Sequence, residues 1–181
     1  MQPGNPADPL LRQVLPSREE CQFEPGFSHD PVGDSQFQPA RGLLQKYQGR
    51  VLLVATGRCA IHCRYCFRRH FPSGHGDRTR SAWDEAINHI ENDSSITEVI
   101  LSGGDPLTLV DAGLEQLIRR IENISHVVRL RIHTRLPIVI PQRMTEDLVN
   151  TLARSRLTVV VVVHCNHTNE IDDAVGRAIG L

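Results

Sequence analysis

Three closely spaced cysteines are the residues of this chain whose types and spacing could do the most chemistry. Cys59, Cys63 and Cys66 form a C-x₃-C-x₂-C arrangement. Three thiolates on one short loop can hold three irons of a [4Fe–4S] cluster. The fourth iron then lacks a protein ligand, so it can bind S-adenosylmethionine (SAM) through its amino and carboxylate groups. The spacing therefore predicts a cluster that passes an electron to the sulfonium of SAM and generates a radical.

Two other metal sites could use the same cysteines. A structural zinc site would take His62 or His70 as its fourth ligand, but zinc sites favour a C-x₂-C pair followed by a distant second pair, which this sequence lacks. A ferredoxin would need a fourth cysteine at a suitable position, and Cys21 and Cys165 are remote in sequence. We expect both to be inert thiols. Five cysteines, an odd number, also argue against a disulfide framework.

The elements that position the cysteine loop follow from the pattern of apolar residues. Short apolar runs predict buried strands, and spacings of three and four predict helices between them. The strands are expected at 51–56, 96–101, 127–132 and 157–163, and the helices at 81–91, at 114–121, after a cap at Thr145 and from Glu170 onward. Four βα units in a row imply an α/β fold with a parallel sheet and helices outside. The pattern alone does not distinguish a doubly wound sheet from part of a barrel.

The first 49 residues differ from the rest. They hold seven of the 11 prolines, which is typical of an extended arm with turns. One short helix is predicted to start at Ser17, where Ser17-Arg18-Glu19-Glu20 has the form of a capping box. The predicted organisation is an N-terminal arm at 1–49 and an α/β domain at 50–181. If this domain is a (β/α) barrel, it is an incomplete one of about four βα units, because a complete barrel takes ~250 residues.

Composition excludes several classes of function. The formal net charge is −1, with 40% hydrophobic and 23% charged residues, so nothing predicts binding to nucleic acid. No apolar run reaches the roughly 18 residues of a membrane span, and no secretory signal is visible. We therefore expect a cytoplasmic protein with no membrane partner. Of the 20 basic residues, only Lys46 is a lysine.

The stretch around the cysteines, from Gly49-Arg50-Val51 to His70-Phe71-Pro72, resembles the lysine 2,3-aminomutase family of radical SAM enzymes. Phe67 and His70-Phe71-Pro72 are most similar to the branch that makes (R)-β-lysine for elongation factor P. Further segments resemble the family in the same order, at 8–16, 30–34, 102–106, 131–135 and 166–171. The resemblance implies a radical SAM aminomutase that converts L-α-lysine to (R)-β-lysine and uses a [4Fe–4S] cluster, SAM and pyridoxal phosphate (PLP).

The resemblance also implies roles for individual residues. Those near SAM would be Tyr65, Ser102, Gly103, Gly104, Asp105, Arg135 and His164. Arg68 would hold the substrate carboxylate, which suits a bidentate guanidinium. The PLP phosphate would lie among Lys46, Tyr47 and Arg50. Plainer interpretations stay open, namely an ordinary βα turn at the glycines, a solvated basic run at Arg68, a surface loop at 46–50 and a structural histidine at His164.

The family departs from this sequence in one respect. PLP is held as a Schiff base to a lysine, which the family places late in the chain, whereas no lysine follows Lys46 here. We therefore expect an N-terminal fragment with the SAM-cleaving half and without the PLP-anchoring half. The alternative is an iron–sulfur and SAM-binding module, or a remnant, without aminomutase activity. The partners implied are lysine, an electron donor, and elongation factor P with its ligase.

Overall fold

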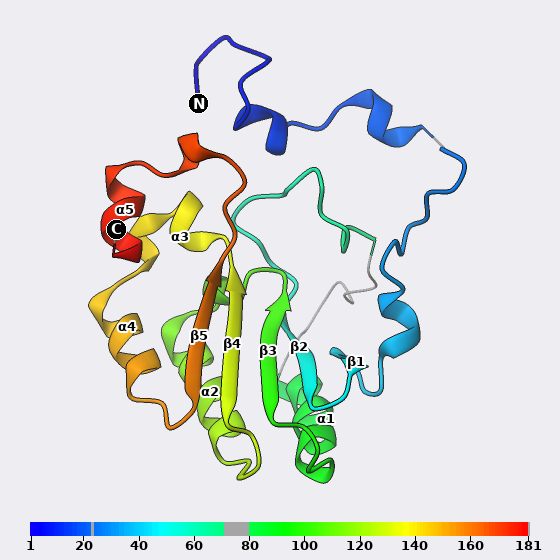
Figure 1. Cartoon of the computed structure of the whole chain (residues 1–181), viewed down its shortest axis with the longest axis vertical. Helices are drawn as coiled ribbons and strands as arrows, with labels where there is room; N and C mark the ends of the chain where they lie inside the picture. The colour runs from blue at the N-terminus through cyan, green and yellow to red at the C-terminus, as the bar shows by residue number, and fades with distance from the viewer. Residues whose placement is uncertain (23, 71–79, 181) are drawn as a thin grey trace.

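A five-stranded sheet organises the part of the chain that the computed structural model describes, residues 1–22, 24–70 and 80–180. Its strands follow one another in space as they do in sequence (Figure 1). They are β1 (Leu43–Tyr47), β2 (Arg50–Thr56), β3 (Glu98–Gly103), β4 (Arg129–Thr134) and β5 (Thr158–Val163). Strands β2 to β5 are parallel, and β1 is antiparallel to β2. The predicted α/β class is confirmed, and the arrangement fits an incomplete (β/α) barrel.

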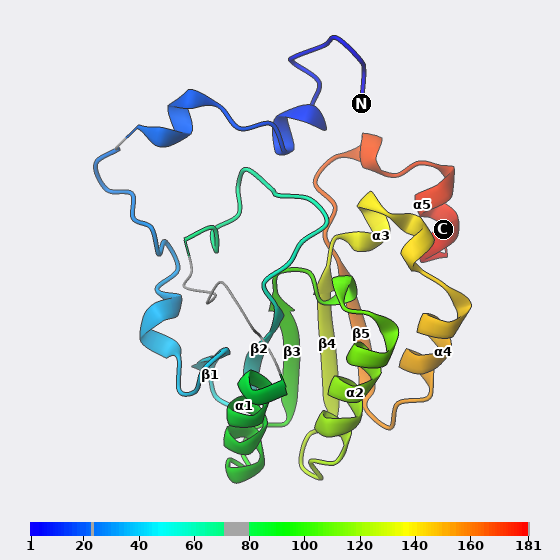
Figure 2. The same cartoon turned by 180° about the vertical axis from the view of Figure 1, so that it is seen from behind.

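Helices pack against one face of this sheet. Figure 2 shows α1 (Arg80–Asn92), α2 (Asp111–Glu122) and α4 (Glu146–Ala153) in front of the strands, while α3 (Leu136–Val139) and α5 (Asp173–Ile179) lie near the carboxyl end of β5. The helix-covered face is apolar because alternate strand residues point to it. Leu53, Leu101 and Ile132 are fully buried there. Among the described residues, no helix combines the length and apolar character needed to cross a bilayer.

The predicted strands all form, with small shifts. β3 and β4 begin two residues later than expected, because Ile96 and Val127 are buried in the turns that precede them, where their amides bond Asp93 and Ile124. Thr145 caps α4 as predicted, accepting the Leu148 amide at 3.2 Å. The expected helix from Glu170 is wrong. Glu170 ends a 3₁₀ turn, and α5 starts at Asp173 because the Asp172 carboxylate caps it.

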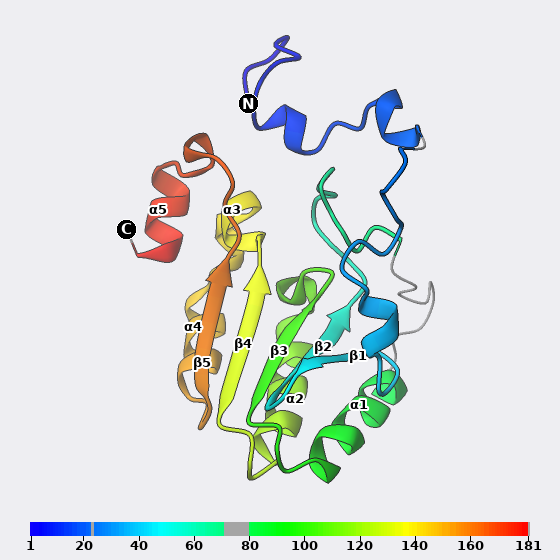
Figure 3. The same ribbon diagram turned by 45° about the vertical axis from the view of Figure 1, so that its right-hand side comes forward.

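The N-terminal residues cross above the carboxyl ends of the strands (Figure 3). They carry three 3₁₀ turns, η1 (Leu11–Gln13), η2 (Arg18–Cys21) and η3 (Asp34–Phe37). The predicted short helix is η2, and the Ser17 amide donates to the Glu20 carboxylate at 3.0 Å. Strand β1 was not predicted, since its five residues do not alternate. It forms because Leu43 and Leu44 are buried beside β2.

Candidate functional site

The cysteine loop leaves the carboxyl end of β2 and is fastened to the loop that follows β3. The Gly104 amide donates to the Thr56 carbonyl at 2.8 Å, and the Asp105 amide donates to the Arg58 carbonyl at 2.7 Å. Within the loop, the Cys66 amide donates to the Cys63 carbonyl at 3.1 Å. The three cysteines are therefore held at the end of the parallel strands where α/β barrels assemble their sites.

Both glycines of the Ser102-Gly103-Gly104-Asp105 segment are required by this close packing. A Cβ on Gly104 would lie 2.7 Å from the Arg58 nitrogen and 2.8 Å from its carbonyl carbon. Gly103 has a φ of 104°, and a Cβ there would lie 3.1 Å from the Thr56 carbonyl oxygen. Only glycine tolerates such an approach without strain. The glycines thus let the cysteine loop sit directly against β3, whatever else they contact.

Asp105 joins the ends of β3 and β4. Its buried carboxylate accepts the Leu107 amide at 3.1 Å, the Thr134 hydroxyl at 2.6 Å and the Arg135 amide at 2.7 Å. Both of its oxygens are therefore occupied by groups of the chain. Asp105 therefore organises the site by holding the Thr134 side chain and the Arg135 backbone in place.

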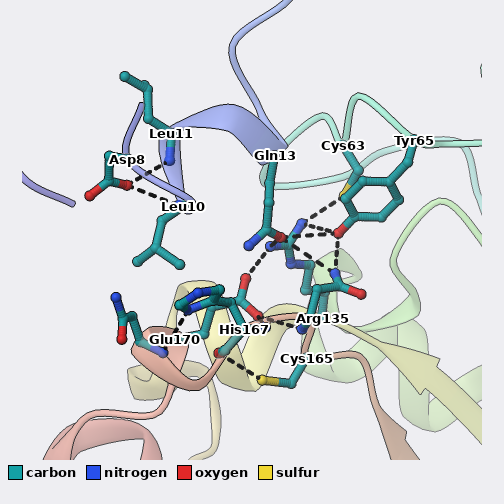
Figure 4. A network of polar contacts seen from close by, with 12 residues as sticks. Asp8, Leu10, Leu11, Gln13, Cys63, Tyr65, Arg135, Cys165, His167 and Glu170 are labelled. Carbon is teal, nitrogen blue, oxygen red and sulfur yellow. Dashed lines mark hydrogen bonds and ion pairs between the residues drawn. The ribbon is translucent and has the colours of Figure 1, made fainter. Parts of the chain in front are cut away.

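Arg135 is the centre of a polar network that reaches from the arm to the loop after β5 (Figure 4). Its guanidinium donates to the Tyr65 hydroxyl at 2.8 Å, to the Gln13 side-chain oxygen at 2.5 Å and to the Glu170 carboxylate. It also lies 2.9 Å from the sulfur of Cys63. The expected SAM residues Tyr65 and Arg135 thus contact each other, and Arg135 also contacts Cys63, an expected cluster ligand.

Burial and hydrogen bonding together determine the protonation of Glu170 and Tyr65 in this network. Burial alone would raise the pKa of Glu170, but the Asn166 amide and the Arg135 guanidinium lower it to about 2. Glu170 is therefore an anion that balances Arg135. Burial and the Cys63 sulfur raise the pKa of Tyr65 to about 12, so its hydroxyl keeps its proton at neutral pH. The Tyr65 ring packs edge-on against His164, with ring centroids 5.9 Å apart.

A pocket of about 380 Å³ brings most of the predicted residues together. It is lined by all three cysteines, by Tyr65 and Arg68, by residues 102–105, and by Arg135 and His164. Its remaining walls include Ile61, Phe67 and His133. A larger, shallower hollow nearby has mainly apolar walls, and its Arg143 is already bonded to Leu107 and Asp111. The chemistry therefore concentrates in the smaller pocket.

The donors in this pocket fit a cluster with three thiolate ligands. Burial and the charge of Asp105 raise the pKa of the Cys59 thiol to about 11, so binding iron there has to displace a proton. Within the described ranges, no three His, Cys, Asp or Glu side chains are already gathered as a metal ion would require. Cys59, Cys63 and Cys66 must therefore draw together around the iron.

Arg68 and Lys46 meet on one carboxylate. Arg68 Nε donates to Asp34 at 2.9 Å, and Lys46 Nζ lies 2.6 Å from the other oxygen of the same group. The predicted substrate-binding and phosphate-binding cations are therefore neighbours, although 22 positions of sequence separate them.

Tyr47 and Arg50 lie at the opposite end of the sheet from the cysteines. They pair with each other where β1 turns into β2, and the Arg50 guanidinium lies 5.8 Å from the centre of the Tyr47 ring. Arg50 also faces the buried Glu98 carboxylate at 3.8 Å. The structure does not bring Tyr47 and Arg50 into the pocket with the cysteines.

Four residues that the sequence analysis gave no role are central to this geometry: Gln13, Glu20, Asp34 and Glu170. Glu20 accepts Arg69 at 3.0 Å and also pairs with Arg64, on either side of Cys66. All four lie in or beside segments rich in turn residues, where the sequence pattern does not indicate which side chains come together in space. The resemblance of segments 8–16, 30–34 and 166–171 to one family covers Gln13, Asp34 and Glu170, whereas Glu20 was expected only as part of a capping box.

Comparison with known proteins agrees with this site. The sequence pattern of the radical SAM superfamily matches residues 53–180. The chain is 49% identical over 179 residues to the L-lysine 2,3-aminomutase of Escherichia coli, covering 99% of this chain and 52% of that protein. It is 48% identical to the L-lysine 2,3-aminomutase of Haemophilus influenzae, covering 97% of this chain and 52% of that protein, and 38% identical to that of Clostridium subterminale, covering 99% and 43%.

The chain spans about half the length of the curated relatives that it matches. The superfamily pattern covers the cysteines, the strands β3 to β5 and the loops that carry Asp105, Arg135 and Glu170. The chain therefore belongs to the radical SAM superfamily.

Proposed function

We propose that this chain holds a [4Fe–4S] cluster and SAM and carries the SAM-cleaving part of a lysine 2,3-aminomutase. The observation that carries the proposal is the shared pocket, in which Cys59, Cys63 and Cys66 lie with Arg68 and Arg135 at the carboxyl ends of parallel strands. When bound, the cluster would supply the electron that cleaves SAM to a radical. The chain's own residues would bind and orient the reactants.

The roles of these residues follow from their contacts. Gly103 and Gly104 let the cysteine loop rest on β3, and both line the pocket beside the cysteines. Arg135, placed by Asp105 and neutralised by Glu170, would face the SAM carboxylate beside Tyr65. Ser102 and His164 line the same pocket and would complete the SAM site.

We further propose that the substrate is L-α-lysine and the product (R)-β-lysine, for the modification of elongation factor P. The similarity to three enzymes that are named L-lysine 2,3-aminomutase supports lysine as the substrate. A guanidinium such as that of Arg68 matches the α-carboxylate of an amino acid. An electron donor, elongation factor P and its ligase are the proposed partners, and the cytoplasm is the proposed location.

PLP fits these residues only in part. Lys46, Tyr47 and Arg50 would be the candidates for its phosphate. A Schiff base needs a free lysine amine, and the chain's single lysine lies 2.6 Å from the Asp34 carboxylate. We therefore assign the residues of this chain to SAM cleavage and not to a Schiff base with PLP.

Anaerobic iron–sulfur reconstitution tests the metal. We expect about four irons and four sulfides per chain, and we expect loss of both when Cys59, Cys63 and Cys66 are replaced together by alanine. Cys21→Ala and Cys165→Ala are the matched controls and should load fully. Stoichiometric zinc without charge-transfer absorbance would refute the cluster.

Electron paramagnetic resonance and a lysine assay separate the two functions that the sequence leaves open. Adding SAM to the reduced cluster should change its spectrum, and an unchanged spectrum in a fully loaded sample would refute SAM binding. The lysine assay contains L-lysine, SAM, PLP and a strong reductant. We expect SAM cleavage without multiple turnovers to β-lysine, as for a SAM-binding module, because no lysine of this chain is free for PLP. Multiple turnovers would show that the 181 residues suffice as an aminomutase.

A further inference from the structure

We infer that Asp34, an arm residue, is a positioning residue that fixes Arg68 so that one edge of its guanidinium faces the pocket and receives the substrate carboxylate. The inference rests on the proposed function and extends it to a residue outside the cysteine loop. It also explains why the predicted substrate cation and Lys46 converge on a single carboxylate.

The local sequence holds Asp34 in place. The segment Asp30-Pro31-Val32-Gly33 makes a turn in which the Gly33 amide donates to the Asp30 carbonyl at 3.2 Å. Gly33 has a φ of 65°, in the left-handed region that favours glycine. The Asp30 carboxylate then accepts the Asp34 amide at 2.8 Å and the Ser35 amide at 2.9 Å. The backbone at the start of η3 is therefore held in place independently of the contacts of the Asp34 side chain.

The Asp34 carboxylate is buried between two cations. Its side chain is 4% exposed, with Lys46 Nζ at 2.6 Å on one oxygen and Arg68 Nε at 2.9 Å on the other. A buried carboxylate is stable only when it is paired, so this geometry is strongly specified. Asp34 therefore pairs with both cations at once, and the Asp30 carboxylate lies beside it.

Arg68 has hydrogen-bond donors that its pairing with Asp34 leaves unused. Asp34 uses only Nε, and within the described residues no hydrogen-bond partner engages the two terminal nitrogens of Arg68. The guanidinium lies 4.5 Å from the centre of the Phe67 ring, within the range of a cation–π contact. Arg68 and Phe67 both line the pocket. Two parallel N–H donors on one edge match a carboxylate bidentately.

A competing interpretation is that Asp34 only fastens the arm to the sheet. Both interpretations predict lower stability when Asp34 is changed. Only the positioning role predicts a selective loss for ligands that carry an α-carboxylate. L-Lysine and 1,5-diaminopentane, which is lysine without its carboxylate, therefore distinguish the two.

The experiment titrates each ligand into the reconstituted, SAM-loaded chain and follows the cluster spectrum by electron paramagnetic resonance. We expect wild type to respond to L-lysine at about tenfold lower concentration than to 1,5-diaminopentane, since one bidentate pair contributes on the order of tenfold. Asp34→Asn should abolish that preference by weakening L-lysine alone, and Asp34→Glu should restore part of it. Arg68→Lys should give the same loss, and the double variant should be no worse than either.

Asp84→Asn is the matched control and should keep the wild-type preference. Asp84 pairs with Arg120 at a distance of 2.7 Å, and neither residue lines the pocket. Acylation of the single lysine, read by mass spectrometry, gives a second measurement. Asp34→Asn should raise the acylation rate of Lys46 several-fold by removing the carboxylate that holds it.

Each outcome decides a different point. A wild-type cluster that ignores SAM would refute the proposed function itself. A SAM response without an L-lysine response, an unchanged preference in Asp34→Asn, or an equal loss for both ligands would refute the positioning role and leave the SAM site standing.

Discussion

The two ends of the sheet are both polar, but they are built differently. At the amino end, the buried Glu98 of β3 pairs with Arg131 of β4 at 2.6 Å and faces Arg50 of β2 at 3.8 Å. These partners lie on strands that are already in register. At the carboxyl end, Asp105 and Glu170 hold groups that come from separate loops and, through Arg135, from the arm. Substitutions at the amino end should therefore lower only the stability of the fold, whereas substitutions at the carboxyl end should also disturb the site.

Among these substitutions, Asp105→Ala should cause the largest loss of stability at the carboxyl end of the sheet. It leaves the Leu107 and Arg135 amides and the Thr134 hydroxyl without their buried acceptor. Each unsatisfied buried group costs about 1–3 kcal/mol, so we expect a loss of about 3–5 kcal/mol of unfolding free energy in urea, together with reduced iron loading. Full iron loading in a folded Asp105→Ala chain would contradict this account of the site.

Glu170→Gln should have the next largest effect, and the effect should depend on pH. The pKa of Glu170 in the folded chain, about 2, lies below its usual 4.5. The ionised group therefore stabilises the fold at neutral pH, and that contribution disappears as the pH falls from about 4.5 to about 2. We expect a difference between wild type and variant of about 2–3 kcal/mol at pH 7 that shrinks by roughly half at pH 3.

Urea unfolding at several pH values measures this difference. His133, whose pKa is lowered by burial and by the nearby Arg131 and Arg68 charges, destabilises both proteins alike below its usual titration range and cancels in the comparison. A difference that stays constant from pH 7 to pH 3 would show that Glu170 is not held as an anion by Arg135.

Glu98→Gln tests the amino end of the sheet and should have a smaller effect than the two substitutions at the carboxyl end. The change weakens the bonds to Arg131, whose side chain is 29% exposed, and to Arg50, which is 49% exposed. Partial exposure lets water replace much of the interaction, so we expect a loss of about 1–2 kcal/mol. Iron content after reconstitution should equal that of wild type. Reduced iron loading at unchanged stability would remove the distinction between the two ends.

Gln13→Ala should give the smallest effect. Its side-chain oxygen accepts Arg135 at 2.5 Å and Tyr65 at 3.3 Å, but its backbone carbonyl still accepts the Arg64 amide at 2.8 Å. We expect a loss of about 0.5–1 kcal/mol and faster hydrogen exchange at the Arg64 amide. Unchanged exchange there would mean that the Gln13 side chain does not help to hold the arm on the site.

The same contrast explains how much of the molecule the sequence predicts. Strands β2 to β5 were predictable because each is a short apolar run with a buried face, and the cysteine loop was predictable because its three ligands are adjacent in sequence. Strand β1 was not, since its pairing with β2 and not its own pattern makes it a strand. The partners of Arg68 and Arg135 were not predictable either, because Asp34 and Glu170 reach them only through the tertiary arrangement of turns.

The path of the arm over the strand ends has a consequence for how the chain is made. Gln13 is synthesised before two of the groups that it contacts, Arg135 and Asn166, which follow it by 122 and 153 positions. At roughly 5–20 residues per second, synthesis of that interval takes roughly 8–30 s. Contacts of such long range also form late in folding, because the loop must close first. The arm therefore lacks these partners until the loop that carries Asn166 has been synthesised, so the contacts of Gln13 form after the strands that carry the rest of the site.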